Sequence, residues 1–202
     1  MKPIRIIVCG FGNVGRAFVR LIEDKQGDLK SRYGIAPQIH AVVDIGGAAI
    51  ADTHGLPLGQ LRELMDSGQS IERMASFGRA GMSGAAILQS IPADVLVEAT
   101  PTNLVDGEPA RSHIKAALKK SMDVITANKG PVVLFYKDLQ ERMQSSGGRL
   151  FMSAATAATV AAQAGSGESL SSSAAVIAPS ANQPARGRRG MFACPTRRRR
   201  GS

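Results

Sequence analysis

The stretch Cys9-Gly10-Phe11-Gly12-Asn13-Val14-Gly15-Arg16 decides the fold. It follows a short β-branched run, residues 4–9, which predicts a strand. It leads into residues 14–29, whose apolar side chains recur at helical spacing. A GxGxxG pattern between a strand and a helix is typical of a loop that binds the diphosphate of a dinucleotide, whereas the same pattern alone is a weak signal.

Each glycine of this pattern has a separate physical role. We expect Gly10 to permit the tight turn, Gly12 to let the backbone approach a diphosphate, and Gly15 to allow close packing of helix on strand. The NH groups at the start of the helix would then face the phosphates. The alternative is that the three glycines only mark a tight turn.

Up to about residue 150, apolar runs of strand type alternate with helical patterns, the order expected of a parallel sheet with helices on both faces. The other predicted strands are residues 39–43, 95–99, 123–127 and 149–152, with a further candidate near Ser76. The other predicted helices are residues 58–66, 109–120 and 134–144, and residues 74–84 are too rich in glycine to assign. The predicted fold class is therefore α/β, a Rossmann-type doubly wound parallel sheet.

The formal net charge of +9 lies mostly near the end of the chain. Residues 1–150 hold 18 Lys/Arg and 15 Asp/Glu, whereas residues 151–202 hold 7 Arg and a single Glu. In the latter part Ala, Ser, Gly and Pro dominate without periodicity, so we predict a domain of residues 1–157 and a low-complexity, disordered basic tail of residues 158–202. The arginines of residues 197–200 could contact nucleic acid, but no aromatic residues lie among them, so a solvated end is the preferred interpretation.

The cysteines and the first residues indicate the compartment. Cys9 and Cys194 are too far apart in sequence to suggest a disulfide framework or a metal cluster, which favours a reducing, cytoplasmic location. The apolar stretch after Lys2 and Arg5 is too short for a signal peptide or a membrane span. We therefore expect no metal site and no membrane partner.

Asp44 ends the second predicted strand and is the candidate to accept hydrogen bonds from an adenosine ribose. It lies 29 residues after Gly15, further than the usual spacing, and a long helix and loop account for the difference. A carboxylate there would repel a 2′-phosphate and favours NAD over NADP, although nearby arginines would reverse this preference, so NAD and NADP both stay open. The alternative is an ordinary solvated aspartate at a strand end.

Two further motifs begin where later strands end. Thr100, Pro101 and Thr102 follow the strand of residues 95–99, and their hydroxyl and backbone groups are expected beside the nicotinamide half of the cofactor. Lys129 follows the strand of residues 123–127, where an ammonium could hold a ribose hydroxyl or a carbonyl oxygen that gains charge during hydride transfer. The alternatives are a helix-capping loop for the first motif and a solvated surface charge for the second.

Together these motifs resemble the NAD(P)-binding domain of homoserine dehydrogenase. The resemblance rests on Gly-Phe-Gly-Asn-Val-Gly, Val-Asp-Ile-Gly-Gly, Val-Glu-Ala-Thr-Pro-Thr-Asn and Thr-Ala-Asn-Lys-Gly-Pro, and it extends to the run beginning at Phe151, about three quarters of the chain. It implies interconversion of L-homoserine and L-aspartate 4-semialdehyde in threonine, methionine and isoleucine biosynthesis. It also implies that Phe11, Asn13 and Val14 contact the cofactor through the glycine turn, with Thr100 and the catalytic Lys129 beside the nicotinamide ribose.

The sequence departs from that family beyond the shared motifs. Family members continue into a substrate and dimerisation domain, which we do not recognise here, so we expect the chain to be truncated and inactive alone, with homoserine bound only if such a domain is supplied. From about Ala158 the composition suggests an out-of-frame translation, which is a hypothesis. The alternatives are the nucleotide-binding half of another amino-acid or semialdehyde dehydrogenase, or a non-catalytic dinucleotide-binding module with a nucleic-acid-binding tail.

Overall fold

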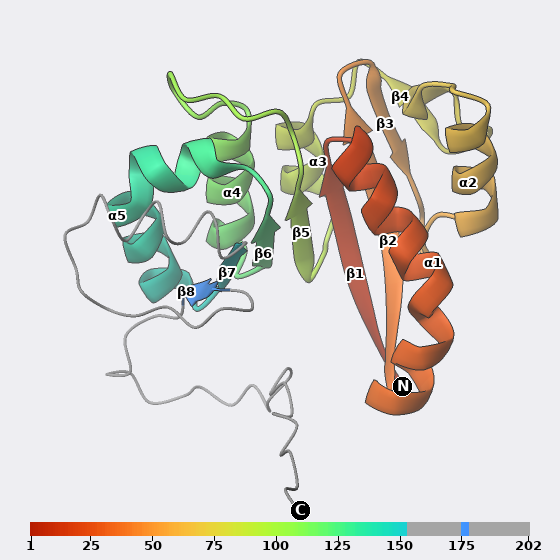
Figure 1. Ribbon diagram of the computed structural model, residues 1–202, viewed down its shortest axis with the longest axis horizontal. Helices are drawn as coiled ribbons and strands as arrows, with labels where there is room; N and C mark the ends of the chain where they lie inside the picture. Colours follow the sequence, from red (N-terminus) through yellow and green to blue (C-terminus); the bar gives the residue numbers. More distant parts are fainter. Residues whose placement is uncertain (153–174, 178–202) are drawn as a thin grey trace, which may run out of the picture.

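The computed structural model describes residues 1–152 and 175–177, and in this part of the chain eight strands form one sheet of order β4-β3-β2-β1-β5-β6-β7-β8 (Figure 1). The strands are β1 (Lys2–Cys9), β2 (Ile35–Asp44), β3 (Gly47–Ile50), β4 (Gly78–Ala80), β5 (Val95–Glu98), β6 (Asp123–Thr126), β7 (Leu150–Met152) and β8 (Ala175–Ile177). The helices are α1 (Asn13–Tyr33), α2 (Leu58–Asp66), α3 (Gly84–Ser90), α4 (Ala110–Lys119) and α5 (Lys129–Ser146), with a 3-10 helix η1 (Ile71–Arg73).

The centre of the sheet has the predicted parallel arrangement. Neighbouring strands are parallel from β2 through β1, β5 and β6 to β7. After β1 the chain moves outward to β2, and it later returns to the other side of β1 to form β5. This reversal is a topological switch point, and in open parallel sheets ligands bind outside the carboxyl ends of the strands at such a point. The fold therefore directs attention to the ends of β1 and β5, where Cys9 and Glu98 are register partners.

The edges of the sheet differ from the prediction because they are antiparallel. β3 pairs antiparallel with β2, β4 with β3, and β8 with β7. Gly47 begins β3, and a Cβ on it would lie 2.3 Å from the carbonyl oxygen of Arg79 on β4. The glycine thus permits close strand approach, which local sequence does not distinguish from a loop.

Two helices also differ from the prediction. α5 begins at Lys129, five residues before the predicted start, because the side chain of Asn128 accepts the NH of Gly130 and caps the helix. Phe135 interrupts α5 with non-helical backbone angles, so the apolar periodicity of the sequence predicted only the part of α5 from about the kink onward. α3 was not predicted because its seven residues are short for a periodic pattern, and the Ser83 hydroxyl caps it by accepting the NH of Ala86.

Helices cover both faces of the sheet, as expected of a doubly wound fold (Figure 1). One buried cluster unites α1, α2 and η1 with the alternate residues of β1 and β2 that face them, Val8 and Val42 among them. The other unites α3, α4 and α5 with the opposite residues, including Ile7 and Val43. The alternation along each central strand therefore places two apolar layers around one sheet.

The predicted tail lies outside the described residues apart from Ala175–Ile177, which form β8 against β7. The predicted domain boundary after residue 157 also lies outside them. Within the described part of the chain, no helix is long and apolar enough to cross a bilayer.

Candidate functional site

Gly10 and Gly15 are required by the packing of the chain on itself. Gly10 has a φ of 94°, and a Cβ on it would lie 2.5 Å from the carbonyl carbon of Ala99, at the end of β5. A Cβ on Gly15 would lie 2.0 Å from the carbonyl oxygen of Gly10. The turn after β1 therefore passes directly over the end of β5, and the first turn of α1 packs directly on that turn.

Gly12 lies between them, but nothing in the described chain requires a glycine there. A Cβ on Gly12 would meet no described atom within 4 Å beyond its chain neighbours, and its φ of −77° suits any residue. Gly12 is also the N-cap residue of α1, which has no side-chain cap and no acidic residue in its first turn. Asn13 and Val14 are exposed. The start of α1 thus presents uncapped NH groups and a partial positive charge to open space.

Phe11 and Arg16 hold the turn from the other side. The ring of Phe11 is buried in the cluster beneath α1 and α2. The Arg16 guanidinium donates to the carbonyl of Phe11 at 2.9 Å and to that of Met65 in α2 at 3.3 Å. The side chain of Phe11 is therefore unavailable to a ligand, and any contact from this residue runs through its backbone.

Asp44 lies half-buried at the end of β2, where the sequence placed it. Its carboxylate makes no hydrogen bond or ion pair with any residue that the structure describes. A second carboxylate lies against the following turn, because a Cβ on Gly46 would be 2.8 Å from the carboxyl oxygens of Glu72. A second acidic group therefore lies close to this end of the site.

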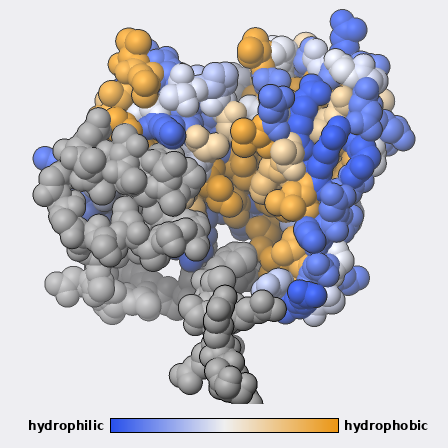
Figure 2. Space-filling view, in the orientation of Figure 1, coloured by the Kyte–Doolittle hydropathy of each residue, from blue (hydrophilic) through white to orange (hydrophobic). Residues whose placement is uncertain are grey.

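Exposed apolar side chains flank the same edge of the sheet. Ile45, next to Asp44, is 99% exposed, and Leu104 and Val105 are exposed in the loop after β5. Figure 2 shows hydrophobic surface over the β2–β3 turn and over this loop. The exposed apolar side chains of the β2–β3 turn and of the loop after β5 therefore both lie beside the carboxyl ends of the parallel strands.

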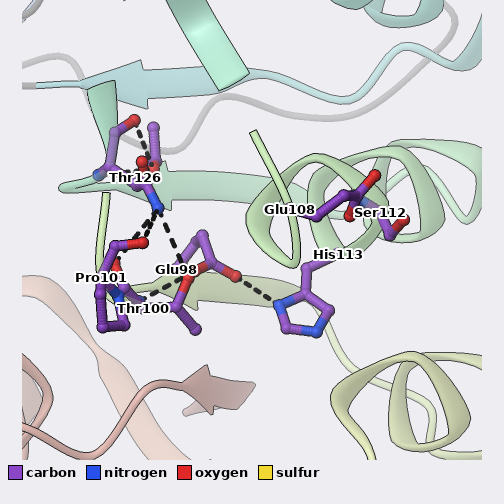
Figure 3. A network of polar contacts seen from close by, with 8 residues as sticks. Glu98, Thr100, Pro101, Glu108, Ser112, His113 and Thr126 are labelled. Atoms are coloured by element: carbon purple, nitrogen blue, oxygen red, sulfur yellow. Dashed lines mark hydrogen bonds and ion pairs between the residues drawn. The ribbon is translucent and has the colours of Figure 1, made fainter. Parts of the chain in front are cut away.

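Thr100 and Pro101 follow β5 and are held by a network of polar contacts (Figure 3). The Glu98 carboxylate accepts the backbone NH of Thr100 at 2.9 Å and also its hydroxyl. Across the gap to β6, the Asn128 side-chain amide donates to the carbonyls of Thr100 at 3.2 Å and Pro101 at 3.1 Å. The ends of β5 and β6 are thus joined by side chains, and the loop after β5 is fixed at both sides.

Lys129 is the residue after Asn128 and the first residue of α5. Its side chain is exposed and forms no ion pair or hydrogen bond within the described residues. Because Asn128 holds Thr100 and Pro101, the structure brings the Thr100 and Lys129 segments side by side at the carboxyl edge. An exposed ammonium at this edge can bind a sugar hydroxyl or a developing negative charge.

No role was predicted from the sequence for Glu98, His113 or Asn128, although Glu98 and Asn128 lie inside two of the motifs. Glu98 was read as part of an apolar strand, but its side chain is 0% exposed and bonds to His113 of α4 through Oε2 and Nδ1 at 2.7 Å. A carboxylate inside an otherwise apolar strand run is the signal that could have found it, because buried charges need partners. The partner could not be read from sequence.

Cys9 completes a buried cluster with these two groups. Within the described chain, one ligand atom each from Cys9, Glu98 and His113 lies within 4.8 Å of the others. Burial raises the pKa of the Cys9 thiol well above its usual value, and the nearby Glu98 charge adds to the effect. A neutral thiol and an imidazole nitrogen already bonded to the carboxylate suit a hydrogen-bonded network better than a metal site.

Comparison with known proteins identifies the family of this chain. The family model described as the NAD-binding domain of homoserine dehydrogenase matches residues 10–153. The chain is 39% identical over 142 residues to a homoserine dehydrogenase from Methanocaldococcus jannaschii, a match covering 70% of this chain and 41% of that protein. It is 33% identical over 140 residues to an NAD(+)-dependent homoserine dehydrogenase from Pseudomonas canavaninivorans, covering 69% of this chain and 40% of that protein. The chain therefore spans about two fifths of the length of these curated relatives.

A solved structure agrees on the fold. A hyperthermophilic archaeal homoserine dehydrogenase in complex with NADPH superimposes with a TM-score of 0.63 at 23% identity, covering 77% of this chain and 44% of that one. At this identity the likeness supports the shared Rossmann-type fold alone.

Proposed function

The chain belongs to the homoserine dehydrogenase family and carries its NAD-binding domain, and from this premise we propose how its residues hold the dinucleotide. The diphosphate lies on the turn from Gly10 to Gly15, against the NH groups of Asn13 and Val14 at the start of α1. The adenosine ribose lies at Asp44, and the nicotinamide half lies beside Thr100, Pro101 and Lys129. From adenosine to nicotinamide, these positions follow the carboxyl ends of β2, β1, β5 and β6, which is their order across the sheet.

The open space at Gly12 is the observation that carries this proposal. Gly10 and Gly15 are explained by contacts within the chain, but Gly12 is not, since a Cβ there would meet no described atom within 4 Å. A glycine whose Cβ direction is empty fits a position where another molecule approaches the backbone closely. An uncapped helix N-terminus at the same point favours an anionic group.

The reaction proposed for the complete enzyme is oxidation of L-homoserine to L-aspartate 4-semialdehyde, with NAD(P)+ reduced to NAD(P)H. The bound dinucleotide would supply the hydride acceptor, and the hydroxyl proton of homoserine leaves as its carbinol carbon becomes the aldehyde. Lys129 would bind oxygen at the nicotinamide end, and Thr100 would hold the loop beside the ring. The described residues provide the cofactor half, so homoserine turnover requires groups that bind the substrate in aligned geometry.

Composition supports two further expectations about the setting of this function. The widely separated cysteines still favour a cytoplasmic location. We propose the dinucleotide as the partner and expect neither a membrane nor a nucleic acid as a second one.

Isothermal titration of the full 202-residue chain with NAD+ and NADP+ tests this function. We expect one site per chain, with NAD+ bound more tightly because Asp44 and Glu72 place negative charge near the 2′-position. We also expect no detectable oxidation of homoserine by this chain alone. A chain that melts cooperatively but releases no heat with either dinucleotide would contradict the proposal.

A further inference from the structure

A buried carboxylate lies directly beneath the loop proposed to hold the nicotinamide half. The Glu98 side chain is 0% exposed, and its partner His113 is 7% exposed (Figure 3). A carboxylate removed from water is stable only when its oxygens are hydrogen-bonded. Both oxygens are used here, Oε2 by His113 and Oε1 by Thr100. The Glu98–His113 pair therefore holds the Thr100 loop in place and is also part of the core.

The bonds from Glu98 fix both the position and the hydrogen-bonding polarity of Thr100. Glu98 Oε1 accepts the backbone NH of Thr100 and also its hydroxyl proton. The hydroxyl is thereby committed as a donor toward the interior. Its oxygen accepts the Asn128 side-chain amide at 3.4 Å, and its second lone pair is left to accept from outside. An accepting oxygen at this edge suits a donor such as a carboxamide NH2 or a ribose hydroxyl.

His113 is itself held rigidly, which lets it orient Glu98. A Cβ on Gly84, the first residue of α3, would lie 2.4 Å from His113 Nε2. The ring is therefore packed between the start of α3 and the sheet, with Nδ1 directed at the carboxylate 2.7 Å away. The carboxylate partner fixes the proton on Nδ1. The packing of α3 and α4 thus fixes His113, and His113 in turn fixes Glu98 at the edge of the sheet.

We propose that Glu98 and His113 are positioning residues that hold Thr100 in place for the nicotinamide half of the dinucleotide. The inference rests on the proposed function, because it assumes that the dinucleotide binds at this edge. The pair lies beneath the loop after β5, whereas the diphosphate is proposed at the turn after β1 and the adenosine at the end of β2. Substitution of either residue of the pair should therefore weaken binding of the nicotinamide half and leave binding of the diphosphate and adenosine unchanged.

The test compares two ligands that share the adenosine diphosphate group, NADH and ADP, on the full chain, because ADP lacks both the nicotinamide ring and its ribose. In His113→Leu the hydrogen bond donor to Glu98 is lost, so Glu98 no longer holds Thr100 in position. We expect NADH affinity to fall about five- to tenfold, the loss that corresponds to one hydrogen bond between Thr100 and the ligand. ADP affinity should stay within about twofold, because its proposed contacts lie at the turn after β1 and the end of β2. His113→Asn places an amide NH near the position of Nδ1 and should restore most of the NADH affinity.

Two controls separate positioning from a general loss of structure. His40 is also buried, but it lies within β2, so His40→Leu should lower the melting temperature without changing the ratio of NADH to ADP affinity. Should His113→Leu not fold, Glu98→Gln keeps the shape and removes the charge, and the same ratio should fall in that variant. The fluorescence of bound NADH should shift in step with the affinity.

The outcomes distinguish this inference from the function on which it rests. If the wild-type chain binds neither ligand, the proposed function is wrong and this inference falls with it. If the wild-type chain binds both ligands and the affinity ratio is unchanged in His113→Leu, or in Glu98→Gln where His113→Leu does not fold, the site stands and the positioning role is wrong. An equal loss of both affinities in well-folded variants would likewise overturn it.

Discussion

The glycine turn yields a prediction in which stability and binding respond differently to the same chemical change. Gly12→Ala and Gly15→Ala each add one methyl group within the same short loop. The methyl at Gly15 would lie 2.0 Å from the carbonyl oxygen of Gly10, whereas the methyl at Gly12 would meet no described atom within 4 Å. Gly15→Ala should therefore destabilise the fold, whereas Gly12→Ala should weaken binding of the ligand.

The magnitudes follow from these distances. Because Cβ contacts under 3.0 Å are essentially never seen, α1 or the turn must move by about 1 Å in Gly15→Ala. Overpacking of this kind costs about 1–3 kcal/mol, partly offset by about 1 kcal/mol from better helix propensity. Each net kcal/mol lowers the melting temperature by roughly 2–4 °C in a chain of this size. Gly12→Ala should cost under about 1 kcal/mol, the difference between glycine and alanine as an N-cap.

Binding should show the reverse order of effects. A methyl on Gly12 projects where the diphosphate is proposed, and losing one or two hydrogen bonds to a charged group costs about 1.5–3 kcal/mol each, a loss of at least about tenfold in affinity. Thermal melts by circular dichroism give the stability, and isothermal titration with NADH gives the affinity. Gly59→Ala in α2 is the matched control, since its methyl would also meet nothing within 4 Å, and it should leave binding unchanged. Wild-type NADH affinity in Gly12→Ala would refute the assignment of the turn.

Three further predictions address the rest of the site. Asp44→Ser should raise NADP+ affinity about fivefold, because a carboxylate that repels the 2′-phosphate is removed, and titration showing no gain would exclude Asp44 from cofactor selection. Lys129→Met should weaken NADH about fivefold without moving the melting temperature, whereas the exposed Lys137→Met on the same helix should change neither; equal effects would remove Lys129 from the site. In a Cys194→Ser background, Cys9 should resist a thiol reagent at pH 8 until the chain unfolds. Burial raises the pKa of the Cys9 thiol in the folded chain. The free energy of unfolding should therefore not depend on this thiol below its unfolded pKa near 9.0, and should fall as the pH rises above that value. A free energy of unfolding that stays constant above that value would contradict the shift.

Local sequence was sufficient for the features that depend on neighbouring residues. The glycine spacing after a β-branched run predicted the turn between β1 and α1, and the ends of apolar runs predicted where Asp44, Thr100 and Lys129 would emerge. These inferences succeeded because all parallel strands present their carboxyl ends at one edge of a sheet. A residue that ends such a strand is therefore placed in space by its position in sequence.

Some side-chain directions were decided by packing instead. The apolar pattern of α1 included Val14 and Leu21, yet both are 53% exposed, and the buried residues of the helix are Gly15, Val19 and Ile22. Contact between Gly15 and the turn sets the rotation of the helix on the sheet. The same packing buries the ring of Phe11, so the cofactor contact that the family resemblance implies for this residue can run only through the backbone of the glycine turn.

Only the tertiary structure decided which distant residues meet. At one edge, β3 and β4 approach at Gly47 more closely than a side chain would permit, and no periodic signal marks such an approach. Glu98 pairs with His113 because α4 packs over the end of β5. A sequence specifies that a buried carboxylate needs a partner, but the identity of that partner depends on which helix the folded chain lays across the strand.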